Sequence, residues 1–320
     1  MAELNNLISL APQFNEKLYN AVDKSFWKLF STDHSAFITE RAKIEIPQFS
    51  GAIPSYDITS STDWNAITLS QVAHTYKEYG FAQKGFGPVF VSSFDYENIP
   101  YDKASFVMDQ MVKDAVQYVA EYITYNWTSV ATNNVIPTTG TKTRTNKFGN
   151  TAIKRLTVKD ISDANMKLDE QKGVPSDGRV CLLTARMFQD LKLDDDFNNS
   201  DMLKTNILSK GEVGSVDGVR LIIRETNNVF SSAGSALQAF GATPGATDLQ
   251  YALVYHPDFV AQAVATQYGN GVGSAFFVGR KPGLQGQWVM EGYVRLGATI
   301  MYLGDGGTND TGVVTIRESN

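Results

Sequence analysis

Apolar residues recur every three or four positions in the first 39 residues of the chain. They are Leu7, Leu10, Phe14, Leu18 and Val22, and the aromatic run FWKLF follows from residue 26. This spacing is typical of helices with one apolar face. Residues 1–39 are therefore predicted to form an arm of short helical pieces that lies on another surface.

Residues 40–99 have a different pattern, in which apolar and polar residues alternate. KIEIPQF begins the stretch, a polar segment rich in turn-forming residues follows, and PVFVSSFDY ends it. Alternation on both sides of a turn indicates one long β-hairpin. Its aromatic side chains are Tyr56, Trp64, Tyr76, Tyr79, Phe81 and Phe86. Because an isolated two-stranded ribbon is marginally stable in water, a partner surface is expected to cover these side chains.

Helical spacing returns between residues 101 and 132. Apolar residues from Met108 to Ile123 fall on one face, and acids, amides and a lysine occupy the positions between them. Pro100 and Asp102 suit the start of a helix. Such a helix is far longer than the globular average of about 11 residues. An elongated molecule is therefore expected.

Residues 133–156 follow as a loop with five basic residues and no acid. The basic residues are Lys142, Arg144, Lys147, Lys154 and Arg155. Two interpretations stay open at this point: a loop surrounded by solvent, or a contact with phosphate or with acidic groups of a partner.

From residue 157 the chain has a mixed α/β pattern. Thr157 and Asp160 have the spacing of a capping box at the start of a helix. VCLL reads as a buried strand, and Thr184 can cap the helix after it. Asp217-Gly218 is a favoured hairpin turn before the strand VRLII. Further strands are predicted after residue 250, and the fold class is α+β.

The segment GEVGSVDGV contains Gly211, Gly214 and Gly218. A dinucleotide-binding loop would need GxGxxG between a strand and a helix, whereas here both the spacing and the following strand are wrong. The chain also contains no GxxxxGK[ST] phosphate loop and no GxSxG nucleophile motif.

Composition narrows the function further. The net charge of −6 argues against nucleic-acid binding over the whole surface, because that requires clustered Lys and Arg. The lone cysteine, Cys181, permits no intrachain disulfide and no cysteine-rich zinc site, and the three histidines, at 34, 74 and 256, have no ligand spacing. No secretory signal and no membrane-spanning apolar run is found. We therefore expect a soluble protein that is not an enzyme, with no metal and no cofactor.

The order of these parts resembles the major capsid proteins of tailed bacteriophages, whose fold is shared with encapsulin shells. Three stretches carry the resemblance. VFVSSFDYENIPYDKASFVMDQMVKDAVQYVAEYI is similar to the exit of the family's extended loop into its spine helix, and LTVKDISDANMKLDEQKGVPSDGRVCLLTARMFQDL is similar to its axial domain. GEVGSVDGVRLIIRETNN resembles the glycine turn that feeds a core strand, so these glycines are expected to shape a scaffold.

The resemblance implies a division of the chain into five parts. They are an N-terminal arm at 1–39, an extended loop at 40–99, a spine helix and peripheral domain at 100–156, an axial domain at 157–274, and C-terminal strands at 275–320 that return to the peripheral domain. It also implies hexamers and pentamers in an icosahedral shell around double-stranded DNA, in which the aromatic side chains of the extended loop contact a neighbouring subunit.

The expected partners are other copies of the chain, a separate scaffolding protein, a portal, decoration proteins and, through weak contacts of the basic loop, packaged DNA. No membrane partner is expected, and the location is the virion, after assembly in the cytoplasm of a bacterial host. Two alternatives stay open: an encapsulin-type compartment shell, and a β-rich fibre or adhesin.

Overall fold

The computed structural model describes residues 10–23, 25–38, 43–50, 73–92, 103–171, 173–194, 212–231, 236–265, 275–280, 287–301 and 311–320. The helices are α2 (Leu10–Asp23), α3 (Phe26–Leu29), α5 (Lys103–Asn126), α6 (Val158–Asp169) and α7 (Ala185–Lys192), with 3-10 turns at Ser35–Phe37, Thr132–Asn134 and Pro257–Phe259. The strands are β1 (Thr32–Asp33), β2 (Lys43–Ser50), β3 (Ala73–Gly80), β4 (Ala82–Ser92), β5 (Val135–Pro137), β6 (Thr143–Arg144), β7 (Ile153–Lys154), β8 (Val180–Leu183), β9 (Glu212–Val216), β10 (Val219–Ile223), β11 (Tyr251–Tyr255), β12 (Val260–Val264), β13 (Ala275–Arg280), β14 (Gln287–Ile300) and β15 (Val313–Arg317).

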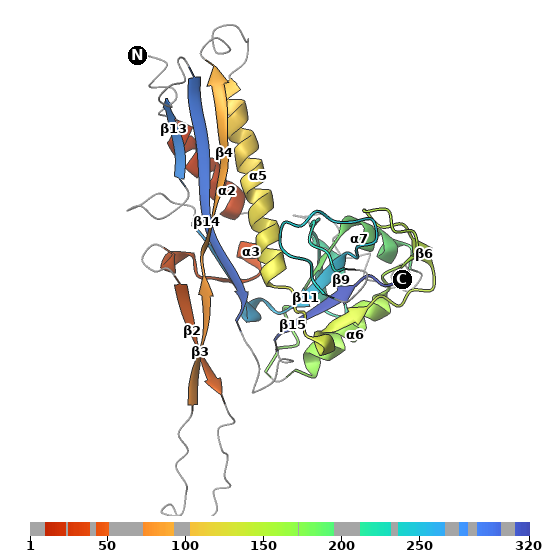
Figure 1. Cartoon of the computed structure of the whole chain (residues 1–320). Helices are drawn as coiled ribbons and strands as arrows, with labels where there is room; N and C mark the ends of the chain where they lie inside the picture. The colour runs from red at the N-terminus through yellow and green to blue at the C-terminus, as the bar shows by residue number, and fades with distance from the viewer. Residues whose placement is uncertain are drawn as a thin grey trace, which may run out of the picture.

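The first part of the molecule is a long sheet with two helices beside it. Its strand order is β1-β12-β14-β13, and β4 pairs with β14 as well. Helix α5 runs alongside β4 and β14, while α2 packs against α5 and β13 (Figure 1). Phe14 and Leu18 of α2 are fully buried in the core shared with α5. The apolar stripe of the predicted arm therefore lies on the spine helix and sheet of its own chain.

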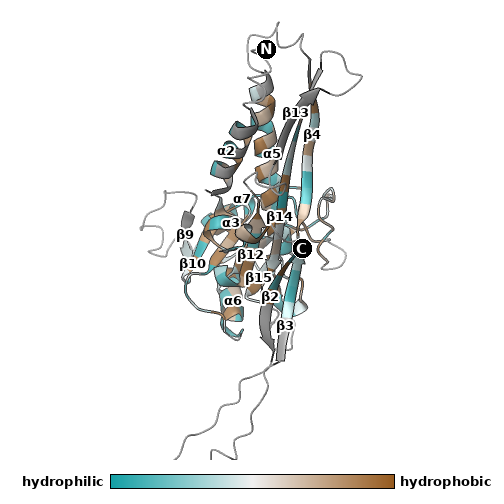
Figure 2. Ribbon diagram, turned by 90° about the vertical axis from the view of Figure 1, so that its left-hand side faces the viewer, coloured by the Kyte–Doolittle hydropathy of each residue, from teal (hydrophilic) through white to brown (hydrophobic). Residues whose placement is uncertain are grey.

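Helix α5 is shorter than the predicted 101–132. It ends at Asn126, and the next residue, Trp127, is fully buried and donates through Nε1 to the carbonyl oxygen of Ala261 at 3.0 Å. In Figure 2 hydrophobic and hydrophilic residues alternate along α5, as expected for a helix with one buried face. The spacing of apolar residues could not predict where the helix ends, because Trp127 contacts Ala261, which is distant in the sequence.

The second part of the molecule is a six-stranded sheet of order β5-β15-β11-β8-β10-β9. Strand β8 is buried along its whole length, since Val180 and Leu182 face the core that contains α5, while Cys181 and Leu183 face the core beneath α6 and α7. Burial on both faces explains why VCLL is a continuous apolar run without alternation.

Local signals in this second part are confirmed. Thr157 accepts from the backbone N–H of Asp160, and the Asp160 carboxylate accepts from the backbone N–H of Thr157, which completes a capping box. Thr184 accepts from the backbone N–H of Met187. Asp217 and Gly218, with φ of 50° and 76°, form the turn between β9 and β10. This is the backbone shape that a two-residue hairpin with Asp-Gly requires.

The hairpin is shorter than the predicted 40–99. Strands β2 and β3 pair from Lys43↔Gly80 to Ser50↔Ala73, whereas β4 leaves the ribbon and pairs antiparallel with β14. In Figure 1 the β2–β3 ribbon projects away from the lower end of β4 and β14. The alternating pattern identified strands correctly but could not identify the partner of β4, which lies some two hundred residues further along the chain.

The C-terminal strands also divide between the two parts. Strands β13 and β14 belong to the long sheet, whereas β15 pairs with β11 and β5 in the six-stranded sheet. The β15 side chains Val314 and Ile316 pack in the core beneath α6 and α7. None of the described helices has the length and apolar character needed to cross a membrane.

Candidate assembly surfaces

The root of the β2–β3 hairpin is held by a small apolar cluster of its own. Ile44 of β2 and Tyr79 of β3 pack with Ile38, Ala263 and Ala265. This cluster joins three segments that are distant in sequence: the arm, the hairpin and β12. The hairpin therefore emerges from a packed base.

His34 links the arm directly to this base. Its Nδ1 lies 2.9 Å from the hydroxyl of Tyr79, and the two rings stack at 6.2 Å. Burial lowers the pKa of His34 below its ordinary value of 6.5, and the nearby carboxylate of Asp33 partly offsets this. Burial likewise raises the pKa of Tyr79 above its usual range. Burial therefore favours the neutral form of both side chains.

A glycine makes room for the aromatic residues at the hairpin root. A Cβ at Gly297 of β14 would lie 2.8 Å from Cδ1 of Phe81 and 3.1 Å from Cε2 of Tyr79. The guanidinium of Arg295 lies over the ring of Phe81, 5.1 Å from the ring centre. Phe81 therefore contacts both the backbone of Gly297 and a cation.

The six aromatic residues expected to face a neighbour lie in different environments. Tyr76 is 63% exposed on β3, as a contact residue should be in a lone subunit. Tyr79 differs from the expectation, because its side chain is 7% exposed and already buried in its own subunit. Phe81 is partly covered by Arg295, and Phe86 packs edge-on against Tyr118 of α5 at 5.9 Å. Tyr56 and Trp64 lie outside the described residues.

The basic loop is folded onto the body of the molecule and does not form one solvated surface. Arg144 donates from Nε to Asp190 at 2.5 Å and from Nη2 to Glu318 at 2.6 Å. Glu318 also accepts from the side chain of Asn146 and from the backbone N–H of Gln250. Arg144 is therefore the centre of a buried network and is not available to DNA or to a neighbour.

The remaining four basic residues are in mixed surroundings. Lys147 donates to Asn227 at 2.9 Å and lies 3.3 Å from Glu225. Lys142 and Lys154 are exposed, and within the described part of the chain their side chains have no hydrogen-bond or ion-pair partner. Arg155 is partly buried, and its Nε has no hydrogen-bond partner among the described residues. Among the described residues, Lys142, Lys154 and Arg155 are therefore the cations of the loop whose side chains make no hydrogen bond or ion pair, although Arg155 lies close enough to Asp190 to lower its pKa.

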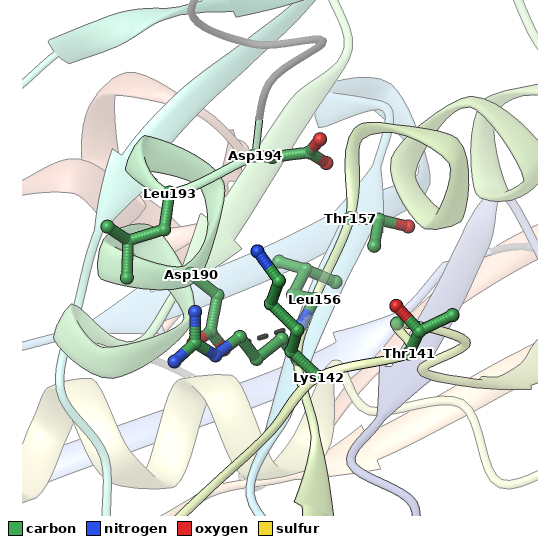
Figure 3. A pocket seen from close by; sticks show the side chains of 9 residues that line it. Thr141, Lys142, Leu156, Thr157, Asp190, Leu193 and Asp194 are labelled. Atoms are coloured by element: carbon green, nitrogen blue, oxygen red, sulfur yellow. Dashed lines mark hydrogen bonds between the residues drawn. The ribbon is translucent and has the colours of Figure 1, made fainter.

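A cavity of about 180 Å³ lies where this loop meets the end of α7. Its lining residues are Gly140, Thr141, Lys142, Arg155, Leu156, Thr157, Asp190, Leu193 and Asp194. Figure 3 shows the Lys142 side chain extending into the cavity, with Asp190 and Leu193 on one side and Thr157 on the other. Burial raises the pKa of the Asp190 carboxyl above its ordinary value, and Arg144, the backbone N–H of Leu156 and Arg155 offset this effect.

The glycines of the opening segment act through the backbone. Gly214 and Gly218 have φ of 123° and 76°, and a Cβ at either would meet no atom within 4 Å. Conformation, not space, therefore selects glycine at these two positions. Gly211 lies outside the described residues.

Two features of the described residues concern metal binding and thiol chemistry. They hold no cluster of three or more His, Cys, Asp or Glu side chains suited to a metal ion. Burial raises the pKa of the Cys181 thiol far above its usual range, which leaves it protonated and unreactive. The charged residues that sequence reasoning missed, Asp190 and Glu318, belong to the Arg144 network, and no local signal marked them.

Comparison with known structures defines the fold. No family model matches the sequence, and a search of curated proteins finds no match either. Several solved structures of bacteriophage capsids do match over most of the chain. The chain has the major capsid protein fold of tailed bacteriophages.

Three of the similar structures indicate the extent of the match. The capsid of Ralstonia phage GP4 has a TM-score of 0.65 and 12% identity, covering 90% of this chain and 86% of the other. The capsid of cyanophage P-SCSP1u has a TM-score of 0.56 and 13% identity, covering 90% and 86%. The acid-stable capsid of Helicobacter pylori bacteriophage KHP30 has a TM-score of 0.56 and 13% identity, covering 86% and 84%.

Proposed function

We propose that this protein is the major capsid protein of a tailed bacteriophage, a non-enzymatic subunit that assembles into hexamers and pentamers of an icosahedral shell around double-stranded DNA. The observation that carries the proposal is the match to phage capsid structures over about nine-tenths of the chain. At 12% identity this likeness establishes the fold, and assembly is the step that requires an experiment.

The shape of the subunit supports the proposal. The β2–β3 ribbon projects from the body and has exposed Tyr76 on it, while its root is packed against the arm and β12 (Figure 1). An isolated ribbon of two strands is marginally stable in water, so a neighbouring subunit is the natural surface to cover it. The unit with α6 and α7 lies to one side of the long helix, where it can face a symmetry axis.

The proposal includes the partners that such a shell requires. These are other copies of the chain, a separate scaffolding protein, a portal, decoration proteins and weakly bound DNA, within a virion assembled in the cytoplasm of a bacterial host. The aromatic residues Tyr76, Phe81 and Phe86 stay candidates for contacts with a neighbour. Lys142, Lys154 and Arg155 stay candidates for contacts with DNA or with acidic groups.

Electron microscopy of the protein, expressed alone and together with its neighbouring genes, tests the proposal. Closed icosahedral particles containing DNA are expected when the packaging genes are present. Particles filled with a protein cargo would favour a compartment shell instead. A small monomer under every condition would overturn the assembly function.

A matched deletion tests the role of the hairpin. Ser50 and Ala73 are paired across the ribbon, so residues 51–72 can be replaced by a two-residue Asn-Gly turn without changing the register of β2 and β3. The shortened protein is expected to fold and to form no shells. Normal shells from this variant would show that the distal hairpin is not needed for assembly.

A further inference from the structure

The cavity beside the basic loop is lined by two cations, Lys142 and Arg155, and by two carboxylates, Asp190 and Asp194. It lies between the loop at residues 140–142, the segment at 155–157 and the C-terminal end of α7, and its volume is about 180 Å³. Such a volume accommodates one small polar group, not an extended polymer.

The two carboxylates of the cavity are already engaged. Asp190 accepts from Nε of Arg144 at 2.5 Å and from the backbone N–H of Leu156 at 3.3 Å. Asp194 accepts from the backbone N–H of Val158 at 2.9 Å, at the start of α6. Both acids therefore act as fixed parts of the wall.

Among the described residues, neither cation of the cavity donates a side-chain hydrogen bond to these carboxylates, although Arg155 is close enough to Asp190 to lower the pKa of its carboxyl. Lys142 extends into it from the exposed loop and has no side-chain partner in the described part of the chain (Figure 3). Arg155 contributes a guanidinium whose buried Nε has no hydrogen-bond acceptor among the described residues. Thr141 adds a hydroxyl to the lining. A group that only accepts hydrogen bonds complements this arrangement.

We propose that this cavity binds a carboxylate, supplied by an acidic side chain of a second copy of the chain. A singly charged carboxylate suits it better than a phosphate, because Asp190 and Asp194 in the wall repel a doubly charged group more strongly. The chain has 34 acidic and 28 basic residues, so a second copy offers an excess of carboxylates. This inference rests on the proposed self-assembly and names one of its contacts.

Zero-length crosslinking of assembled particles tests the contact directly. A carbodiimide joins a lysine amine to a carboxylate that touches it, and particles made from mixed unlabelled and isotopically labelled subunits distinguish links between chains from links within one chain. Mass spectrometry is expected to find Lys142 joined to an Asp or Glu of a different copy. A Lys142 link found only within one chain, or no Lys142 link at all, would overturn the proposal.

A double variant gives a second, independent measurement. Lys142→Gln with Arg155→Gln is expected to raise the protein concentration needed for assembly by about ten-fold or more. Lys154→Gln is the matched control, because it removes an exposed cation of the same loop that does not line the cavity, and it should leave assembly unchanged. Wild-type assembly by the double variant would overturn this contact alone, whereas absence of wild-type particles would overturn the proposed function and this contact with it.

Discussion

Arg144 and Asp190 form an ion pair in which the Nε and Oδ2 atoms lie 2.5 Å apart and the side chains are only 11% and 3% exposed. The other end of the same guanidinium pairs with Glu318, whose side chain is completely buried. One cation thus neutralises two buried carboxylates that come from α7 and from the C-terminal end of the chain. Through Arg144, the basic loop therefore contacts both α7 and the C-terminal end of the chain.

Loss of Arg144 should destabilise the subunit strongly. Arg144→Met removes the ion-pair partner of two buried carboxylates, and breaking a buried pair in this way typically costs about 3–5 kcal/mol of unfolding free energy. Urea unfolding of unassembled subunits measures the loss. Lys154→Met is the control, since an exposed lysine without a described partner should change stability by less than about 0.5 kcal/mol. Equal stability of the two variants would contradict a structural role for Arg144.

The His34–Tyr79 contact predicts a pH dependence of subunit stability. Burial lowers the pKa of His34 below 6.5, so on acidification the unfolded chain takes up its proton before the folded chain does. The contribution of His34 is therefore unfavourable below its ordinary pKa, and stability should fall as the pH is lowered through about 6.5. In His34→Gln the free energy of unfolding should change less steeply with pH.

Thermal or urea unfolding at several pH values measures this slope. The loss of the hydrogen bond to Tyr79 affects His34→Gln at every pH, so the comparison concerns the change with pH and not the absolute stability. An identical pH slope in the wild type and in His34→Gln would exclude His34 as its source.

Gly297 is predicted to be intolerant of a side chain. A Cβ there would lie 2.8 Å from Phe81 and 3.1 Å from both Tyr79 and the carbonyl oxygen of Gly80. Gly297→Ala should therefore cost about 1–3 kcal/mol and disturb the hairpin root. Gly85→Ala, in the neighbouring strand β4, is the matched control because its nearest contact would be an ordinary 3.4 Å. A Gly297 variant as stable as the Gly85 variant would show that Phe81 moves aside freely.

Tyr76 is predicted to matter for assembly and not for folding. Its side chain is 63% exposed, so Tyr76→Ser should change the stability of the unassembled subunit by less than about 0.5 kcal/mol. An aromatic residue buried at an interface contributes about 2 kcal/mol or more, so the concentration needed for assembly should rise by about ten-fold or more. Light scattering measures the protein concentration at which assembly begins. The control, Tyr76→Phe, should assemble as the wild type does. Unimpaired assembly of Tyr76→Ser would remove Tyr76 from the interface.

Local sequence signals predicted the local structure well. The Thr157–Asp160 capping box, the Thr184 cap and the Asp217-Gly218 turn are all present. Each depends on groups within a few residues of one another, so the residue types alone carry the information. The long amphipathic helix was also identified from its spacing, although its C-terminal end was placed too late.

The sequence by itself thus determined the type and order of the elements, and with them the α+β class. Only the tertiary structure decided that β4 pairs with β14, that Tyr79 is buried within its own subunit, and that Arg144 joins Asp190 and Glu318. Arg144 and Glu318 are 174 residues apart, and nothing in either segment identifies the other. The reason is physical: caps and turns are satisfied by neighbours along the chain, whereas strand partners and buried ion pairs are selected by packing of the whole chain.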